Sequence, residues 1–207
     1  MIRAFCPLVA LLLIMCSHTP SPVSLSSEWP DRVGDYEDVT RAWTREGIIR
    51  APMSQQGDQL LQVHATLKSP EWRTAYVSHL AKRGKYPDNK RQELLAEQKK
   101  QHEEAYEVHL LVATYHPRDN DLRKGKRSIW RIVLVDDSGS EVEASQIKSD
   151  RRSPQEIRSE FPHMHDFHEA YIARFPRDID LFGDDVKLVK FKMSSSRGVV
   201  ELLWRRR

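Results

Sequence analysis

The feature that most constrains the fold is a series of short apolar stretches in the second half of the chain. Strand-forming and aromatic residues recur in runs of six to ten residues, and turn-forming residues separate most of these runs. An earlier run, residues 60–67, alternates apolar and polar side chains as a half-buried strand does. The pattern predicts a mainly β fold with helical insertions: an antiparallel β-sandwich, with the immunoglobulin-like arrangement as its candidate topology. The other predicted strands are residues 106–115, 129–135, 142–147, 169–175, 186–193 and 199–204.

Helical signals interrupt the strands at about residues 69–105. Ser69 is a suitable N-cap, Pro70 fits the first helical position, and Gly84 ends the helix. Residues 88–105 are almost wholly polar, and we interpret them as a surface helix with a narrow contact stripe.

Two further segments complete the predicted domain. A capping box that begins at Ser153, with Glu156 three residues later, predicts a short helix. Residues 39–49 are ambiguous between helix and strand, and we predict a strand. Residues 36–207 are therefore expected to form a single β-sandwich domain.

The first 15 residues have the pattern of a signal peptide. Arg3 precedes an apolar run at residues 8–15, which is too short to span a bilayer, since a spanning helix needs about 20 residues. Residues 16–35 are rich in Ser and Pro, as a flexible tether is. Cys16 lies at the boundary, and no cysteine follows it in the sequence. We therefore expect an exported chain whose domain contains no disulfide.

The segment Leu13, Ile14, Met15 and Cys16 resembles the lipobox of bacterial lipoproteins. In that family, signal peptidase II cleaves before the cysteine, and the cysteine sulfur carries diacylglycerol. The resemblance implies that Cys16 is lipidated and that more than one acyl chain anchors the protein to a membrane. Ser17 implies, by the same resemblance, an outer-membrane lipoprotein that faces the periplasm or the cell surface. The chain departs from the family pattern at Met15, where Gly, Ala or Ser is usual.

Two other interpretations of the N-terminus stay open. A type I signal peptide cut within residues 17–27 would discard Cys6 and Cys16 and release a secreted domain. An uncleaved N-terminal anchor is the second alternative.

The sequence excludes several catalytic classes. Its eight glycines stand at least 10 residues apart, so it contains no GxGxxG fingerprint, P-loop or GxSxG elbow. It has no HExxH motif, and Cys16 is either lipidated or removed, which leaves no cysteine nucleophile. A net charge of +3 with charges of both signs does not indicate nucleic-acid binding. We expect no cofactor, no nucleic acid and no small-molecule substrate.

One cluster, His163, His165, His168 and Asp166, has the residue types of a metal site. Imidazoles and carboxylates bind zinc and copper. In an extended segment His163 and His165 point the same way, and His168 could fold back from a turn. The other interpretation is a loop with solvated histidines.

Three aspartates, Asp178, Asp180 and Asp184, surround a glycine as the acidic ligands of calcium loops do. The segment lacks the regular alternation and the closing Glu of an EF-hand. A solvated loop before a strand is the alternative.

Basic and aromatic residues suggest two further surfaces. The basic groups could together meet anionic glycans or lipid headgroups, although we favour dispersed solubilising charge. Four tryptophans occur in apolar patterns and are predicted to lie in the core, whereas Trp29 could dock locally or be exposed. The basic groups are Arg123, Lys124, Lys126 and Arg127, then Arg151 and Arg152, then Arg205, Arg206 and Arg207, and the core tryptophans are Trp43, Trp72, Trp130 and Trp204.

These observations favour a non-enzymatic, lipid-anchored envelope protein that binds another envelope protein as an accessory or assembly subunit. Two alternatives come from other classes: a periplasmic metal-binding protein that uses His163, His165 and His168, and a secreted hydrolase whose site is assembled from distant residues.

Overall fold

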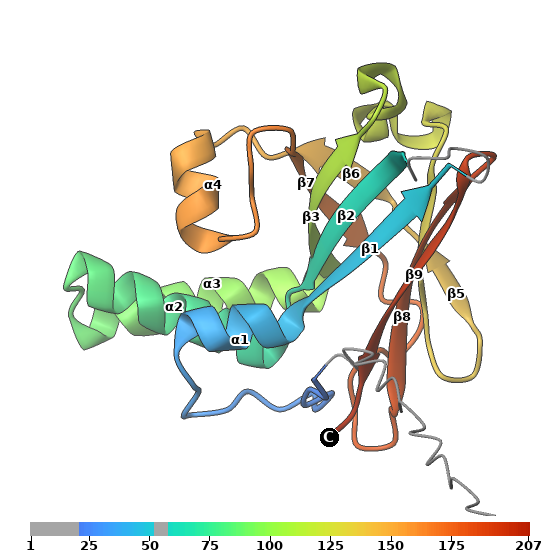
Figure 1. Ribbon diagram of the computed structural model, residues 1–207. Coiled ribbons are helices and arrows are strands. Elements are labelled where there is room, and N and C mark those ends of the chain that lie inside the picture. The colour runs from blue at the N-terminus through green and yellow to red at the C-terminus, as the bar shows by residue number, and fades with distance from the viewer. Residues whose placement is uncertain (1–20, 52–57) are drawn as a thin grey trace, which may run out of the picture.

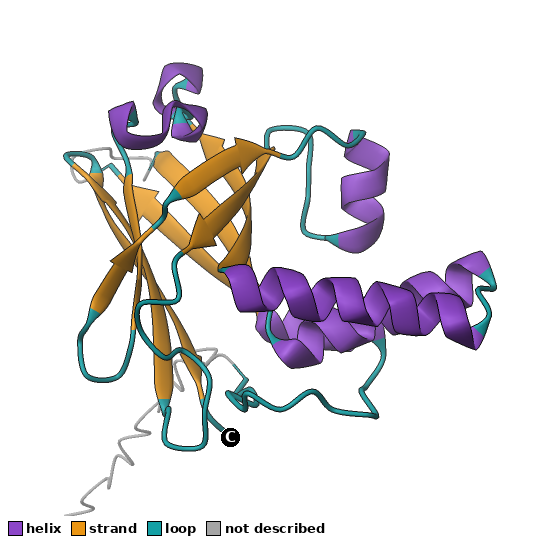
Figure 2. Ribbon diagram, turned by 180° about the vertical axis from the view of Figure 1, so that it is seen from behind, coloured by secondary structure: helices purple, strands orange, loops and turns teal. Residues whose placement is uncertain are grey.

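Two antiparallel sheets face each other across an apolar core in the computed structural model, which describes residues 21–51 and 58–207 (Figure 1; Figure 2). One sheet has the strand order β1-β2-β3-β7-β6, and the other has the order β5-β4-β8-β9. The mainly β, sandwich-like class is confirmed, whereas the immunoglobulin-like arrangement stays a prediction. The strands are β1 (Thr44–Arg50), β2 (Gln59–Leu67), β3 (Tyr106–Thr114), β4 (Arg131–Val135), β5 (Glu141–Glu143), β6 (Gln146–Ser149), β7 (Glu169–Phe175), β8 (Leu188–Ser195) and β9 (Gly198–Arg205).

The core lies between the sheets because alternate side chains of each strand point inward. On β2 the inward set is Leu61, Val63, Ala65 and Leu67, all with no exposed surface. The predicted turn at residues 136–139 joins β4 to β5, and the turn before Gly198 joins β8 to β9, so both expected hairpins are confirmed.

The two sheets meet where β1 passes close to β9. A Cβ atom at Gly47 would lie 2.4 Å from Val200 Cγ1 and 2.9 Å from Leu202 Cδ2, so this approach requires a residue without a side chain. The indole of Trp204 also donates a 2.9 Å hydrogen bond to the carbonyl of Trp43. On the opposite side, the chain passes directly from β5 of one sheet to β6 of the other.

Four α-helices and two short 3₁₀ helices surround the sheets. Figure 1 shows α1, α2 and α3 extending from one end of the five-stranded sheet, with α4 beside that sheet. The predicted N-cap is confirmed, since Ser69 Oγ accepts a 3.0 Å hydrogen bond from the Trp72 amide. The helices are α1 (Tyr36–Trp43), α2 (Pro70–Gly84), α3 (Asp88–Glu104), η1 (Pro117–Asp119), η2 (Leu122–Arg127) and α4 (Pro154–Glu160).

The strand predicted at residues 39–49 was wrong in its first half. Asp35 caps α1 by accepting a hydrogen bond from the Glu37 amide, and the helix continues to Trp43 before β1 begins. Tyr36, Val39 and Trp43 are buried at helical spacing, which is the signal that favoured a helix there.

The domain begins earlier than the sequence suggested. Val23 and Leu25, within the predicted tether 16–35, have no exposed surface. Val23 also pairs with the C-terminal end of the chain, through hydrogen bonds to Arg205 and Arg207. The boundary near residue 36 is therefore corrected to Val23 or earlier.

The signal peptide and Cys16 lie outside the described residues. Within the described ranges, no helix has both the length and the apolarity needed to cross a membrane.

Candidate functional site

The outer face of the five-stranded sheet carries several buried titratable groups. The alternation that sends Val63 inward turns His64 and Thr66 outward on β2, and it turns Glu107 and His109 outward on β3. The segment of α4 and the loop after it lies over this face (Figure 1). The polar side chains there are consequently shielded from water.

A buried ion cluster fastens α2 to this face. Arg73, which has no exposed surface, donates to Glu107 Oε2 over 2.9 Å. Lys68 Nζ lies 3.4 Å from the same oxygen, and Arg174 Nε lies 3.3 Å from Oε1. Burial by itself would raise the pKa of Glu107, but Lys68 and Arg73 lower it below its ordinary value. The carboxylate stays charged and saturated with cations.

A second chain of polar contacts holds α4. His109 Nε2 lies 3.2 Å from Asp150 Oδ2, and Arg152 donates both to Asp150 and, over 2.6 Å, to Glu160 on α4. The His109 ring also stacks on Phe161, with the ring centroids 3.7 Å apart. Burial lowers the pKa of His109 to about 4, which outweighs the attraction of Asp150. These groups position the loop that contains the histidine cluster.

The structure adds a fourth histidine to the predicted cluster. His64 on β2 packs beside His163 and His168, with ring centroids 5.3 Å and 5.2 Å away. The rings of His165 and His168 stack at 3.6 Å, and the His165 amide donates to His168 Nδ1. Asp166, the fourth predicted ligand, is exposed and pairs instead with Arg158 over 2.8 Å.

Two of these imidazoles, those of His64 and His168, are held in an environment that favours their neutral form. Burial, with contributions from neighbouring histidines, lowers the pKa of His64 to about 4 and that of His168 to about 3. Among the described residues, no three or more His, Cys, Asp or Glu side chains are arranged to hold a metal ion. The metal assignment to His163, His165, His168 and Asp166 stays a prediction, and the arrangement gives it no support.

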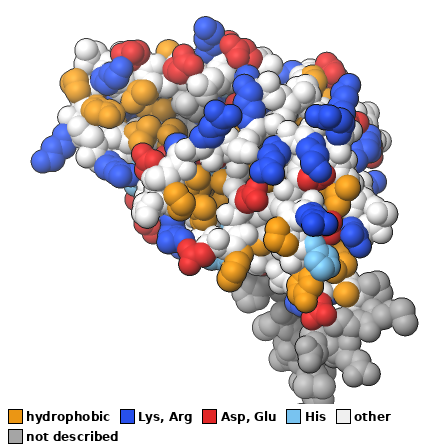
Figure 3. All heavy atoms as spheres, turned by 90° about the horizontal axis from the view of Figure 1, so that it is seen from above, with side chains coloured by type: hydrophobic (Ala, Val, Ile, Leu, Met, Phe, Trp, Pro, Cys, Tyr) orange, Lys and Arg blue, Asp and Glu red, His pale blue; other side chains and the backbone are white. Residues whose placement is uncertain are grey.

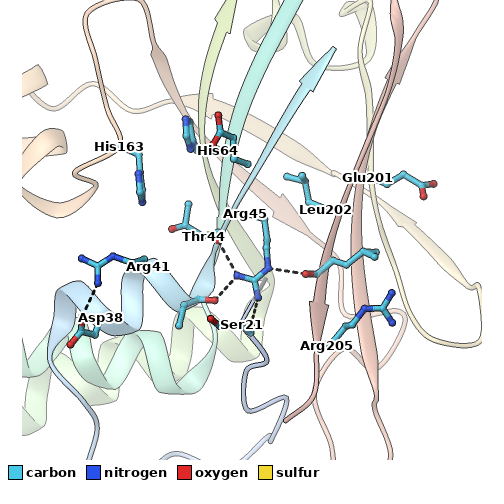
Figure 4. Close-up of a pocket in the computed structure, with 13 residues that line it drawn as sticks. Ser21, Asp38, Arg41, Thr44, Arg45, His64, His163, Glu201, Leu202 and Arg205 are labelled. Carbon is cyan, nitrogen blue, oxygen red and sulfur yellow. Dashed lines mark hydrogen bonds and ion pairs between the residues drawn. The ribbon is translucent and has the colours of Figure 1, made fainter. Parts of the chain in front are cut away.

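A cleft of about 950 Å³ borders this cluster (Figure 4). His64 and His163 line one side, and residues of β9 line the other. Arg45 lies at its centre and donates to the carbonyls of Leu203, Ala42 and Ser21 over 2.8, 2.7 and 2.7 Å. The guanidinium thus ties together β9, α1 and the N-terminal segment.

A second groove, of about 790 Å³, runs along β6. It is lined by six consecutive residues, 146–151, and by Ile172 and Arg174 of β7. Arg123 of η2 lies on its other side. Both carboxylates in the lining, Glu107 and Asp150, already have arginine partners. Among the described residues, the side-chain charges of this groove that are left without an ion-pair partner are therefore positive.

The structure separates the three basic groups named in the sequence. Arg151 lines the β6 groove together with Arg123, whereas Arg152 is engaged by Asp150 and Glu160. Arg206 donates to the carbonyls of Val186, Leu25 and Gly183 near the C-terminus. Figure 3 shows the end of the molecule seen from above, where Lys and Arg side chains gather with fewer Asp and Glu.

The calcium candidates Asp178, Asp180 and Asp184 are exposed on the loop between β7 and β8. They are not arranged as a metal-binding group in the described structure, and the calcium assignment stays a prediction. Their apolar neighbours Leu181 and Phe182 are buried and anchor the loop.

The tryptophan predictions are confirmed. The four predicted core residues are buried. Trp29 docks locally, edge-on to His102 at 5.7 Å and beneath Lys99 Nζ at 5.6 Å.

Sequence reasoning missed His64 and the groove residue Lys148. His64 is an outward position of the predicted strand 60–67, whereas Lys148 lies just beyond the predicted strand 142–147 and belongs to β6 in the structure; only the loop before β7 and the edge position of β6 give them a distinct environment. Comparison of the chain with models of protein families, with curated proteins and with solved structures finds no match.

Proposed function

We propose that this chain is a lipid-anchored, non-enzymatic protein of the bacterial envelope, whose domain binds another envelope protein as an accessory or assembly subunit. The lipobox-like segment before Cys16 supports the anchor and the outer-membrane location. The finer topology that we propose for the sandwich is immunoglobulin-like.

The observation that carries the proposal is the β6 groove. It includes the edge strand β6 and extends over β7, and edge strands and grooves are common docking places for other proteins. In the described structure, Arg123, Lys148 and Arg151 around it have no carboxylate within ion-pair distance. Cationic side chains that have no ion-pair partner within the domain can pair with acidic groups of another protein.

The buried titratable groups support a structural role rather than a catalytic one. Glu107 is saturated by Arg73, Lys68 and Arg174, and Asp150 is engaged by Arg152 and His109. These contacts join helices to a sheet, and each of the two carboxylates is already occupied by arginine partners. We therefore favour protein binding over hydrolysis.

Site-directed photo-crosslinking in the native host tests the binding proposal. A crosslinking amino acid at Lys148 should yield a discrete adduct with one envelope protein, identified by mass spectrometry. The same amino acid at Lys82, which is exposed on α2, is the matched control and should not yield that adduct. Identical adducts from both positions, or none from Lys148, would contradict the proposal.

Intact mass spectrometry of the mature protein, with Cys16→Ser as the comparison, tests the anchor. We expect an N-terminal acylated cysteine that is lost in the variant. An unacylated N-terminus beyond Cys16 would refute the anchor and leave the binding proposal to the crosslinking result.

A further inference from the structure

We propose that the β6 groove receives an extended acidic segment of the partner protein, which lies along the free edge of β6. This inference rests on the function proposed above and specifies the chemistry of the partner.

β6 is the last strand of its sheet and pairs only with β7 in the described structure. Alternate residues of an antiparallel strand direct their N–H and C=O groups to opposite sides, so part of the β6 backbone faces away from β7. The groove is lined by every residue from Gln146 to Arg151, so residues of both faces of β6 reach it, and it extends across Ile172 and Arg174 of β7 to Glu107 of β3. An added strand would find backbone partners there.

A smaller hollow lies next to the start of β6. It has a volume of about 280 Å³, and its lining includes Gln146 and Ile147, which also line the groove, together with Lys126 of η2. Four residues at about 3.3 Å each give β6 a length of roughly 13 Å. A groove lined by six consecutive residues along such a strand suits a short extended peptide and not a single small anion.

The cations are distributed along this path. Lys126 lies near the start of β6, Lys148 lies within it, Arg151 follows its end, and Arg123 lies across the groove. All four are exposed, and none has an ion-pair partner among the described residues. A partner segment with carboxylates at successive outward positions would complement them.

The recessed shape favours a peptide over a membrane surface. Arg174 and Ile172 form part of the lining and are only partly exposed, so a flat layer of headgroups would not reach them together with Arg123 and Lys148. Anionic lipid is therefore the competing outcome in the test.

The test uses the purified protein and a fluorescein-labelled peptide of Glu-Val-Glu-Thr repeats, with binding followed by fluorescence anisotropy. We expect binding at low salt that weakens as the ionic strength rises. The double variant Lys148→Glu with Arg151→Glu should raise the dissociation constant roughly tenfold or more, because two favourable contacts become repulsive. The control Lys82→Glu with Lys100→Glu has the same change in net charge at exposed sites on α2 and α3, and it should bind as wild type does.

A second peptide, N-methylated at alternate residues, separates strand pairing from simple charge attraction. It keeps every carboxylate but loses backbone donors, and we expect it to bind at least several-fold more weakly. Circular dichroism checks that both double variants are folded.

Three results would overturn the inference: no binding of the acidic peptide by wild type, equal losses in the two double variants, or unchanged binding of the N-methylated peptide. Lipid binding is tested by sedimentation of the protein with phosphatidylglycerol vesicles. If wild type fails to bind the peptide but sediments with the vesicles, and the Lys148→Glu, Arg151→Glu variant does not sediment, the groove binds lipid instead. If the crosslink from Lys148 persists while the peptide fails, this inference is refuted and the proposed function stands. If both fail, the proposed function is refuted as well.

Discussion

Acidification should destabilise this protein at a pH where few other groups titrate, because several histidines are buried in their neutral form. Burial lowers the pKa of His64 and His109 to about 4, and that of His102 and His168 to about 3. An unfolded chain has histidine pKa values near 6.5. Between about pH 6.5 and the folded-state pKa values, the unfolded chain binds more protons than the folded one. The free energy of unfolding should therefore fall as the pH falls through this window.

His109 allows the magnitude to be worked out for one group. It is buried, stacked on Phe161 and in contact with Asp150, and its pKa moves from 6.5 to about 4. Below about pH 6, one such group lowers the free energy of unfolding by about 1.4 kcal/mol per pH unit, which amounts to about 2 kcal/mol between about pH 7.5 and pH 5. Asp150 does not interfere, since its pKa is lowered and the unfolded carboxylate titrates only near pH 4.

The assay is urea unfolding followed by tryptophan fluorescence at several pH values. The variant His109→Gln keeps a polar side chain and removes one proton-binding site, so its pH dependence should be shallower by about 1.4 kcal/mol per pH unit, even if it is less stable at neutral pH. The control His116→Gln is at an exposed position and leaves all four buried imidazoles in place. A wild-type stability that is flat between about pH 7.5 and pH 5, or an unchanged slope in His109→Gln, would refute the reasoning.

Three further predictions concern packing and charge. Gly47→Val should lower the free energy of unfolding by about 2 kcal/mol or more, since its Cβ would lie 2.4 Å from Val200 Cγ1; an unaltered urea midpoint would show that the sheets do not approach closely there. Ser69→Ala should cost about 1 kcal/mol through loss of the α2 N-cap, whereas Ser69→Asp should retain most of the stability. Arg73→Met should lower the free energy of unfolding by about 3 kcal/mol, because it leaves Glu107 buried with fewer cations. The loss should be smaller in a Glu107→Leu background. Additive losses in this double-mutant cycle would argue against a direct interaction between the two side chains.

The local elements of the fold could largely be predicted from the sequence. Alternation on β2, the cap and proline that begin α2, the capping box of α4 and the two hairpin turns all depend on residues close together in the chain. The predicted tether failed because a distant residue decides: the partner of Val23 lies at the opposite end of the sequence. The first half of the strand predicted at residues 39–49 failed for a local reason, since the helical spacing of Tyr36, Val39 and Trp43 is present in the sequence.

The candidate site shows the same division. The sequence indicated that His163, His165 and His168 lie close together, since they are separated by a few residues in one loop. It did not indicate His64, which lies about 100 residues earlier and meets them only because α4 and its loop fold over β2.

The sequence by itself determined the secondary-structure class, the apolar and polar faces of the strands, and the identity of the charged residues. The tertiary structure decided which of those charges are free. Arg73, Arg152 and Arg206 are each bound to carboxylates or carbonyls within the domain, whereas Lys148 and Arg151 lie along an edge strand with no such partner among the described residues. The physical reason is that charge pairing depends on distances of a few ångströms between side chains, and only the packing of sheets and helices sets those distances.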